Sequence, residues 1–146
     1  MIQVDVSIDI NAPVDKVFEY STNNENDPAW MEEVVKVRKT SDGPVGVGST
    51  FINYGEFLGR GFEDSHEIVE YDPNTSMTVV QKTGRVPFEA NYLYRPLEGG
   101  TRFSMHIEAE PGGFFKLATP LLRRWLKSQF ETNLKNLKVI LEKQSE

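Results

Sequence analysis

Apolar and polar residues alternate along most of this chain, and this alternation constrains the fold more than any other feature. From Ile2 to Ile10 every second residue is apolar, and polar residues occupy the positions between. Successive side chains of a strand point to opposite faces of a sheet, so this segment predicts a strand with one buried face. Six further strands are predicted, near residues 34–40, 49–54, 61–71, 76–82, 88–95 and 101–110. Short turns separate most of them, which indicates an antiparallel meander.

Two short helices are predicted between the first and second strands. Pro13 suits a first helical turn, and Val14, Val17 and Phe18 follow it at helical spacing. Farther along, residues 27–30 read Asp-Pro-Ala-Trp, in which the acid can cap a helix and the proline can take its first position.

The C-terminal segment predicts one long helix whose apolar stripe changes side. At about 100° per residue, the apolar positions of residues 114–125 and those of residues 126–141 lie on faces about 120° apart. Pro120 could kink a continuous helix, or Thr119 could cap a new helix with Pro120 in its first turn. The downstream half is expected to pack on the sheet. The upstream half, with Leu117, Leu121 and Trp125, has apolar surface left over.

Composition places limits on function. The chain has 146 residues, which fits a single domain over residues 1–146 that is large enough for a core and a cavity. Its formal charge of −6 disfavours nucleic acid as a partner, and the lack of cysteine excludes thiolate chemistry. No apolar run approaches the roughly 20 residues that span a bilayer. The N-terminus lacks the features of a secretory signal, so we expect a cytoplasmic protein.

The inner face of the sheet can be predicted from the alternation. Phe88, Tyr92 and Tyr94 share one face of their strand, as Phe103 and Met105 do on the next. On the earlier strands the pattern is less regular. There Glu63, Ser65 and Glu67 fall in phase with Tyr71, and Asn53 falls in phase with Phe51, so polar groups could reach the inner face. For the two carboxylates, exposure to solvent at the open end of the sheet is the favoured interpretation. His66 and His106 fall in the opposite phase and are expected to point outward.

Several segments together resemble a known superfamily. They read IDINAPVDKVFEY, DPAW, VGVGSTF, HEIVEYDP, YLYRPLEGGTRFSMHIE and GGFFKLATPLLRRWLKSQFETNLKNLKVILE, and they cover nearly the whole chain. In this order they resemble the START-like, or SRPBCC, superfamily, in particular its polyketide cyclase/dehydrase and lipid-transport branch with relatives of the birch pollen allergen. The resemblance implies an α+β helix-grip fold, in which a curved seven-stranded antiparallel sheet wraps a long C-terminal helix.

The resemblance also implies a cavity between sheet and helix that holds a lipid, polyketide or similar hydrophobic molecule. The residues expected to contact this ligand, with Trp30 near the entrance, are Trp30, Phe51, Asn53, Tyr71, Val79, Phe88, Tyr92, Tyr94, Met105, Leu117, Leu121 and Trp125. No cofactor is implied, and the chain is expected to be a monomer or homodimer. With two histidines and no cysteine, the sequence contains no metal-binding or nucleophilic motif.

Three functions are compatible with these features. The first is binding or transport of a small hydrophobic or aromatic ligand. The second is an enzyme of the cyclase, aromatase or dehydratase type, with Glu67 and Tyr92 as candidates for proton transfer. Against this role, carboxylates are mostly exposed, and tyrosines on strands serve a core as well as a site. The third is a protein-interaction module like the co-chaperones of the superfamily, which would need an exposed apolar patch.

Overall fold

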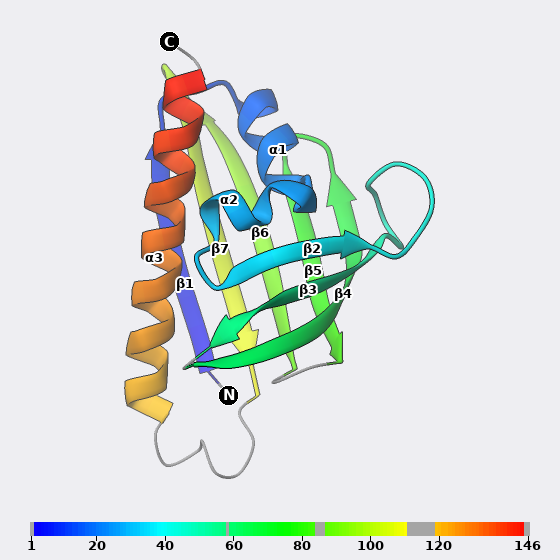
Figure 1. The fold of residues 1–146 in the computed structure, drawn as a ribbon. Coiled ribbons are helices and arrows are strands. Elements are labelled where there is room, and N and C mark those ends of the chain that lie inside the picture. The colour runs from blue at the N-terminus through cyan, green and yellow to red at the C-terminus, as the bar shows by residue number, and fades with distance from the viewer. Residues whose placement is uncertain (1, 58, 84–86, 111–118, 145–146) are drawn as a thin grey trace.

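The computed structural model describes residues 2–57, 59–83, 87–110 and 119–144. The elements, labelled as in Figure 1, are strands β1 (Ile2–Ile10), β2 (Val34–Lys39), β3 (Thr50–Phe57), β4 (Arg60–Asp72), β5 (Ser76–Thr83), β6 (Phe88–Leu97) and β7 (Gly100–Ala109), helices α1 (Val14–Thr22), α2 (Asp27–Trp30) and α3 (Thr119–Gln144), and the 3₁₀ helix η1 (Asn24–Asn26).

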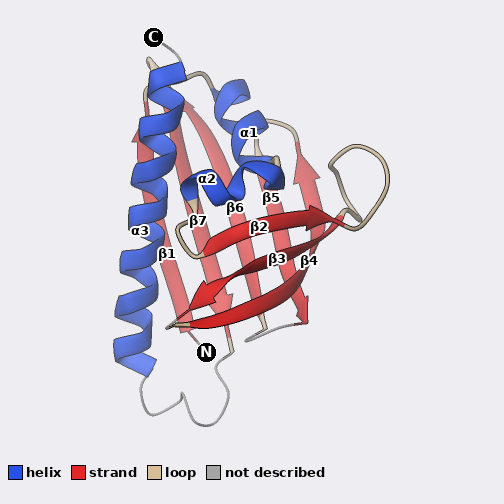
Figure 2. Ribbon diagram, viewed as in Figure 1, coloured by secondary structure: helices blue, strands red, loops and turns tan. Residues whose placement is uncertain are grey.

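All the strands form one antiparallel sheet in the order β1-β7-β6-β5-β4-β3-β2. Figure 1 shows that β2 and β3 run across the direction of β1, β7 and β6, so the sheet curves strongly around its inner side. Figure 2 shows α3 lying along the β1 side, with α1 and α2 in front of the sheet. The predicted seven-stranded antiparallel sheet, the two short helices after β1 and the long C-terminal helix are confirmed.

Helix α3 packs on the sheet through the stripe predicted for its downstream half. Leu134, Leu137 and Leu141 are buried, with Phe130 and Ile140 half-buried beside them. These positions recur every three or four residues and therefore form one face of the helix. The helix is described from Thr119 onward, which places Pro120 in the first described turn. The predicted kink and the residues 112–118 upstream of it lie outside the described residues.

A buried asparagine ties α3 to the chain before β2. Asn133 is 1% exposed, and its amide nitrogen donates to both carboxylate oxygens of Glu33 at 3.0 and 3.1 Å. Its carbonyl oxygen accepts from the backbone N–H of Glu32 and from the Gln129 amide. Every strong hydrogen-bonding group of this side chain is therefore used, as buried amides require. The contact fixes α3 against the segment that leads into β2.

Helix α1 closes one end of the sheet through aromatic contacts. The ring of Phe18 lies 5.3 Å from that of Tyr71 and 5.0 Å from that of Tyr94. The hydroxyl groups of Ser21 and Tyr94 are 2.6 Å apart and form a buried hydrogen bond. Tyr94 is therefore a core residue with a satisfied polar end.

A bulge in β4 reverses the predicted alternation along most of that strand. Ile68 pairs with Val79 whereas Glu70 pairs with Thr78, so β4 has one extra residue, Val69, between these pairs. As a result Ile68 and Tyr71 both face inward, although three positions separate them. The residues that alternate with Ile68 on the inner face are Phe62, Asp64 and His66. The expectation that His66 faces outward is wrong for this reason. Glu63, Ser65 and Glu67 point away from the interior, as favoured for the two carboxylates.

His106 points to the outer face, as predicted. Its Nδ1 lies 2.5 Å from a carboxylate oxygen of Asp5 on β1, and its Nε2 lies 3.1 Å from a carboxylate oxygen of Glu108. These two carboxylates raise the pKa of His106 above 6.5, chiefly through their hydrogen bonds.

The charged form of His106 should therefore stabilise the fold. Because the folded pKa exceeds the unfolded value of 6.5, the contribution is complete below that pH and is lost as pH rises through the folded pKa. We expect His106→Gln to lower Tm more at about pH 6 than at about pH 9, and 1 M salt to reduce the difference. Thermal unfolding of both proteins at each pH measures it. An equal Tm difference at the two pH values would contradict the assignment.

Candidate functional site

A cavity of about 500 Å³ lies between the inner face of the sheet and the first half of α3. Its wall is mostly apolar and is contributed by β1, β5, β6 and β7 on one side and α3 on the other. Representative apolar lining residues are Val79, Phe88, Ala90, Met105, Leu122 and Phe130. The volume falls within the range of pockets that hold drug-sized ligands.

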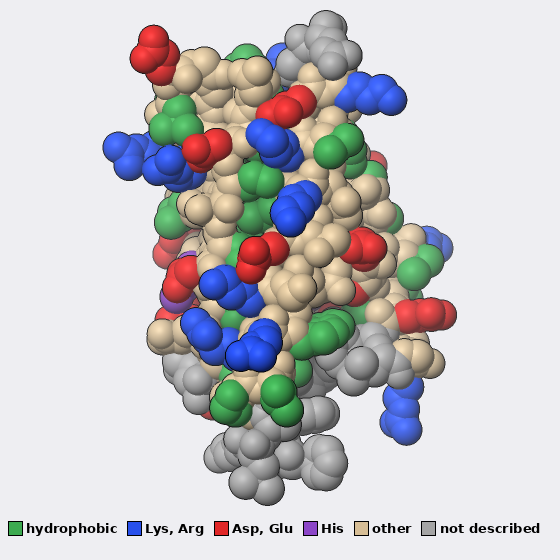
Figure 3. Space-filling model, turned by 90° about the vertical axis from the view of Figure 1, so that its left-hand side faces the viewer, with side chains coloured by type: hydrophobic (Ala, Val, Ile, Leu, Met, Phe, Trp, Pro, Cys, Tyr) green, Lys and Arg blue, Asp and Glu red, His purple; other side chains and the backbone are tan. Residues whose placement is uncertain are grey.

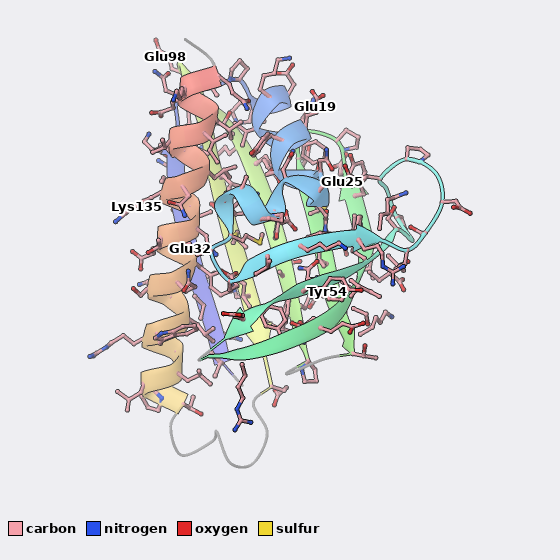
Figure 4. All side chains as sticks on the ribbon, viewed as in Figure 1. Glu19, Glu25, Glu32, Tyr54, Glu98 and Lys135 are labelled. Atoms are coloured by element: carbon pink, nitrogen blue, oxygen red, sulfur yellow. The ribbon has the colours of Figure 1, made fainter. Side chains whose placement is uncertain are left out.

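A row of polar side chains crosses the cavity wall on β3, β4 and β5. Asn53 and Asp64 are cross-strand partners, and His66 follows Asp64 on the same face of β4. The Nε2 of His66 lies 3.2 Å from the side-chain oxygen of Gln81, and its ring lies edge-on to Phe88. All four polar side chains of this row, Asn53, Asp64, His66 and Gln81, are buried. Tyr54, labelled in Figure 4, follows Asn53 and points to the opposite face of β3.

A second polar group enters the cavity from η1 and α2. Asp27, at the start of α2, is 4% exposed, and burial raises the pKa of its carboxyl well above the usual range, with the nearby Glu33 charge adding to the shift. Tyr92 on β6 is also buried, and burial, together with Asp27, raises the pKa of its hydroxyl. Both groups therefore favour their protonated forms, in which each can donate a hydrogen bond.

Two asparagine amides on this wall have an unmatched atom. The side-chain oxygens of Asn24 and Asn53 are buried and have no hydrogen-bond partner among the residues that the structure describes. Both residues line the cavity, and each is 5% exposed. Buried polar atoms without partners are uncommon and costly in folded proteins. The polar side of the cavity thus retains hydrogen-bonding capacity.

Half of the residues predicted to contact a ligand line this cavity. They are Asn53, Val79, Phe88, Tyr92, Met105 and Trp125. They come from β3, β5, β6, β7 and α3, so residues far apart in sequence meet around one space. Their contact with a ligand remains a prediction.

The other predicted residues lie elsewhere. Phe51, Trp30 and Tyr94 belong to the core and are at most 5% exposed. Trp30, expected near the entrance, packs against Phe103 instead, with ring centroids 6.4 Å apart. Tyr71 lies with Phe18 beside α1 and borders a different, open groove.

The residues of α3 that line the cavity differ from the prediction by one position. Leu121 is 71% exposed and turned away from the cavity, whereas Leu122 and Leu126 line it. Trp125, at 38% exposed, lines the cavity and also reaches the surface. Leu117 lies outside the described residues. Figure 3 shows that Lys and Arg side chains gather over this helix, whose exposed residues include Arg123 and Arg124.

Glu67, the carboxylate proposed for proton transfer, does not line the cavity. It forms an ion pair with Lys82, with nitrogen and oxygen 3.7 Å apart, and both side chains are partly exposed. The same bulge that turns His66 inward turns Glu67 away. The polar residues that line the wall, but were missed in the sequence, are Asn24, Asp27, Glu33, Arg60, Asp64, His66, Gln81 and Gln129. Only Gln81 could have been found, because it alternates with Val79.

Two further features concern the described part of the chain as a whole. Across residues 2–57, 59–83, 87–110 and 119–144, no group of three or more His, Asp or Glu side chains is arranged to hold a metal ion. Within the same ranges, no helix has the length and apolar character needed to cross a membrane.

A curved antiparallel sheet that grips a C-terminal helix around an internal cavity defines the helix-grip class of proteins. The sequence matches the family described as polyketide cyclase / dehydrase and lipid transport over residues 1–142. The chain therefore belongs to this family. No curated protein matches the sequence.

Solved structures agree with this fold. The protein TTHA0849 from Thermus thermophilus superimposes with a TM-score of 0.85 at 19% identity, and 99% of each chain is covered. A START superfamily protein from Mycobacterium smegmatis gives 0.82 at 16% identity, with 99% of each chain covered. The Zhui aromatase/cyclase from a Streptomyces species gives 0.79 at 14% identity, covering 99% of this chain and 95% of that one. At these identities the matches establish the fold.

Proposed function

We propose that the protein binds, and thereby carries or stores, a small hydrophobic or aromatic molecule in the cavity between the sheet and α3. The observation that carries this proposal is the cavity itself, about 500 Å³ in volume with a mainly apolar wall. Protein interiors normally pack to crystal density and contain few voids larger than a water molecule. A space of this size, maintained by a chain of 146 residues, is consistent with an occupant.

Apolar burial would supply most of the affinity. Each Å² of apolar surface removed from water contributes about 25 cal/mol before the costs of immobilising the ligand are subtracted. The polar side chains on the other part of the wall would orient the molecule rather than hold it. Native mass spectrometry of protein purified from its own host tests this directly, because it should detect a copurified small molecule. Consistent recovery of ligand-free protein would count against the proposal.

Filling the cavity should remove the binding. Ala90 on β6 is 4% exposed and lines the cavity, so Ala90→Phe places a ring in the proposed binding space. We expect the affinity for naphthalene, measured by ligand-observed NMR, to fall about tenfold or more, because ligand and ring compete for the same volume. Leu93→Phe is the matched control, since Leu93 lies on the same strand and is 50% exposed. Unchanged naphthalene affinity in folded Ala90→Phe protein would place binding elsewhere.

One observation favours a catalytic use of the same cavity as a second candidate. Asp27 and Tyr92 are buried on its wall, and the pKa of each is raised, so both can present a proton to a carbonyl group of a bound substrate. In this alternative they replace Glu67 as the acid. The test is turnover of an identified substrate by Asp27→Asn and Tyr92→Phe. Unchanged kcat in both variants would eliminate the catalytic alternative and leave binding alone.

A further inference from the structure

Asn24 and Asn53 raise the question of what their amides bind. They come from different elements, η1 and β3, and each is 5% exposed on the wall of one cavity. In each, the side-chain oxygen is buried and has no hydrogen-bond partner among the described residues. An asparagine that served only packing could be an apolar residue of similar size at lower cost. Two such amides on the wall of one cavity indicate that the ligand brings a polar group to this side of it.

We propose that the ligand ends in a neutral hydroxyl group, phenolic or alcoholic, and that Asn24 and Asn53 are the residues that select it. This inference rests on the proposed binding function. An amide presents an N–H donor and a carbonyl acceptor, and a hydroxyl group is also both donor and acceptor. A hydroxyl can therefore donate to an amide oxygen and accept from an amide nitrogen. An ether or a hydrocarbon leaves the oxygens unmatched.

Rotation of each amide about its terminal torsion would bring this pairing about. The amide oxygens are covered by protein atoms in the structure, so they reach a ligand only when the amide turns about its terminal torsion. That torsion is broad in asparagine, and because no hydrogen bond from a described residue holds these oxygens, no bond to them is broken by the turn. Asn133 shows the contrast within the same molecule, since four hydrogen bonds fix its amide.

The same wall disfavours a carboxylate in this position. Asp27, Glu33 and Asp64 all line the cavity, and a carboxylate ligand has no proton to donate to the asparagine oxygens. The basic side chains among the described lining residues are Arg60, which is exposed, and His66, which is within hydrogen-bonding distance of Gln81. A hydroxyl group avoids the repulsion that an added negative charge would meet beside Glu33, whose charge already helps to raise the pKa of Asp27.

Four probes share the naphthalene ring and differ in one substituent: naphthalene, 2-naphthol, 2-methoxynaphthalene and 2-naphthoate. Together they separate the contributions of apolar burial, of a hydroxyl group and of a negative charge to the affinity. Their dissociation constants are measured at neutral pH for the wild type and for Asn24→Leu, Asn53→Leu and Asn91→Leu. Asn91 is the control because it lies on β6 next to Tyr92 but faces outward, where it accepts a hydrogen bond from Thr78. Naphthalene binding reports in each variant that the cavity is still formed.

We expect the wild type to bind 2-naphthol roughly tenfold more tightly than 2-methoxynaphthalene, and 2-naphthoate more weakly than 2-naphthol. The preference for naphthol over its methyl ether should shrink to about threefold or less in Asn24→Leu and Asn53→Leu, and persist in Asn91→Leu. Naphthalene affinity should be unchanged or higher in the leucine variants.

The possible results separate the claim that the cavity binds a ligand from the claim that the asparagines select a hydroxyl group. Equal wild-type affinity for naphthol and its methyl ether, naphthoate binding as tight as naphthol, or full selectivity in both cavity variants would overturn the hydroxyl assignment while naphthalene binding upholds the cavity. Failure of the wild type to bind any of the four probes would instead remove the binding function and the hydroxyl assignment with it.

Discussion

Replacing Phe103 with alanine should lower the free energy of unfolding by about 3–5 kcal/mol. Phe103 is fully buried on β7, and three rings surround it: those of Trp30, Tyr92 and Tyr94, with centroids 6.4, 5.6 and 4.9 Å from its own. Truncation removes both the transfer free energy of the ring and its contacts with these neighbours, which belong to two other elements, α2 and β6, and cannot collapse together. Equilibrium unfolding in urea measures the loss.

Leu93→Ala is the control for this substitution. Leu93 lies on the adjacent strand β6 but is 50% exposed, so its truncation should change the free energy of unfolding by about 0.5 kcal/mol or less. Because Tyr92 lines the cavity and touches Phe103, the Phe103→Ala protein should also bind the naphthalene probe less tightly. A loss of stability below about 1 kcal/mol would mean that Phe103 does not organise the core as described.

The second large effect is expected at Gly55 on β3. A β-carbon there would lie closer than 3.0 Å to the backbone carbonyl oxygen of Glu33 and to the ring of Phe62. The carbonyl is held in place because it accepts a hydrogen bond from the backbone N–H of Glu56 at 3.2 Å. Gly55→Ala must therefore push the start of β2 away from β3, which we expect to cost roughly 2–3 kcal/mol of stability.

Gly61 provides a matched control for Gly55. It lies on the neighbouring strand β4, and a β-carbon at Gly61 would meet only the carbonyl oxygen of Gly55, at an ordinary 3.8 Å. Gly61→Ala should thus be neutral or slightly stabilising, because alanine reduces the freedom of the unfolded chain. Urea unfolding of both variants compares them. Similar stabilities for the two proteins would show that β2 and β3 do not approach as closely as the structure indicates.

The fold was predictable because its signals are local. Period-two alternation marks β1, β6 and β7 without interruption, and the two proline-containing segments after β1 mark α1 and α2. The downstream stripe of α3, with Leu134 and Leu137, was equally regular. In each case the residues that satisfy the periodicity are those that the tertiary structure buries.

The site was less predictable because it depends on non-local features. The inward turn of Asp64 and His66 follows from a bulge at Val69, and a bulge arises from the pairing of two strands rather than from the sequence of one. The residue type does not tell whether an apolar side chain borders a cavity or fills a core. For this reason the sequence could not show that Phe88 lines the cavity whereas Phe51 lies in the core. In the sequence, Asp27 was explained by a role as helix cap, so it was not considered for the site. Its burial became visible only in the structure.

The bulge in β4 also bears on how a cavity of this kind can change during evolution. Deletion of the one extra residue at Val69, with Tyr71 kept in place, would rotate the rest of the strand by one position. Glu63, Ser65 and Glu67 would then replace Asp64 and His66 on the inner wall, although no other residue had changed. A single-codon deletion could thus exchange one chemical lining for another in one step. Ligand preference in this architecture can therefore diverge through strand register as well as through substitution.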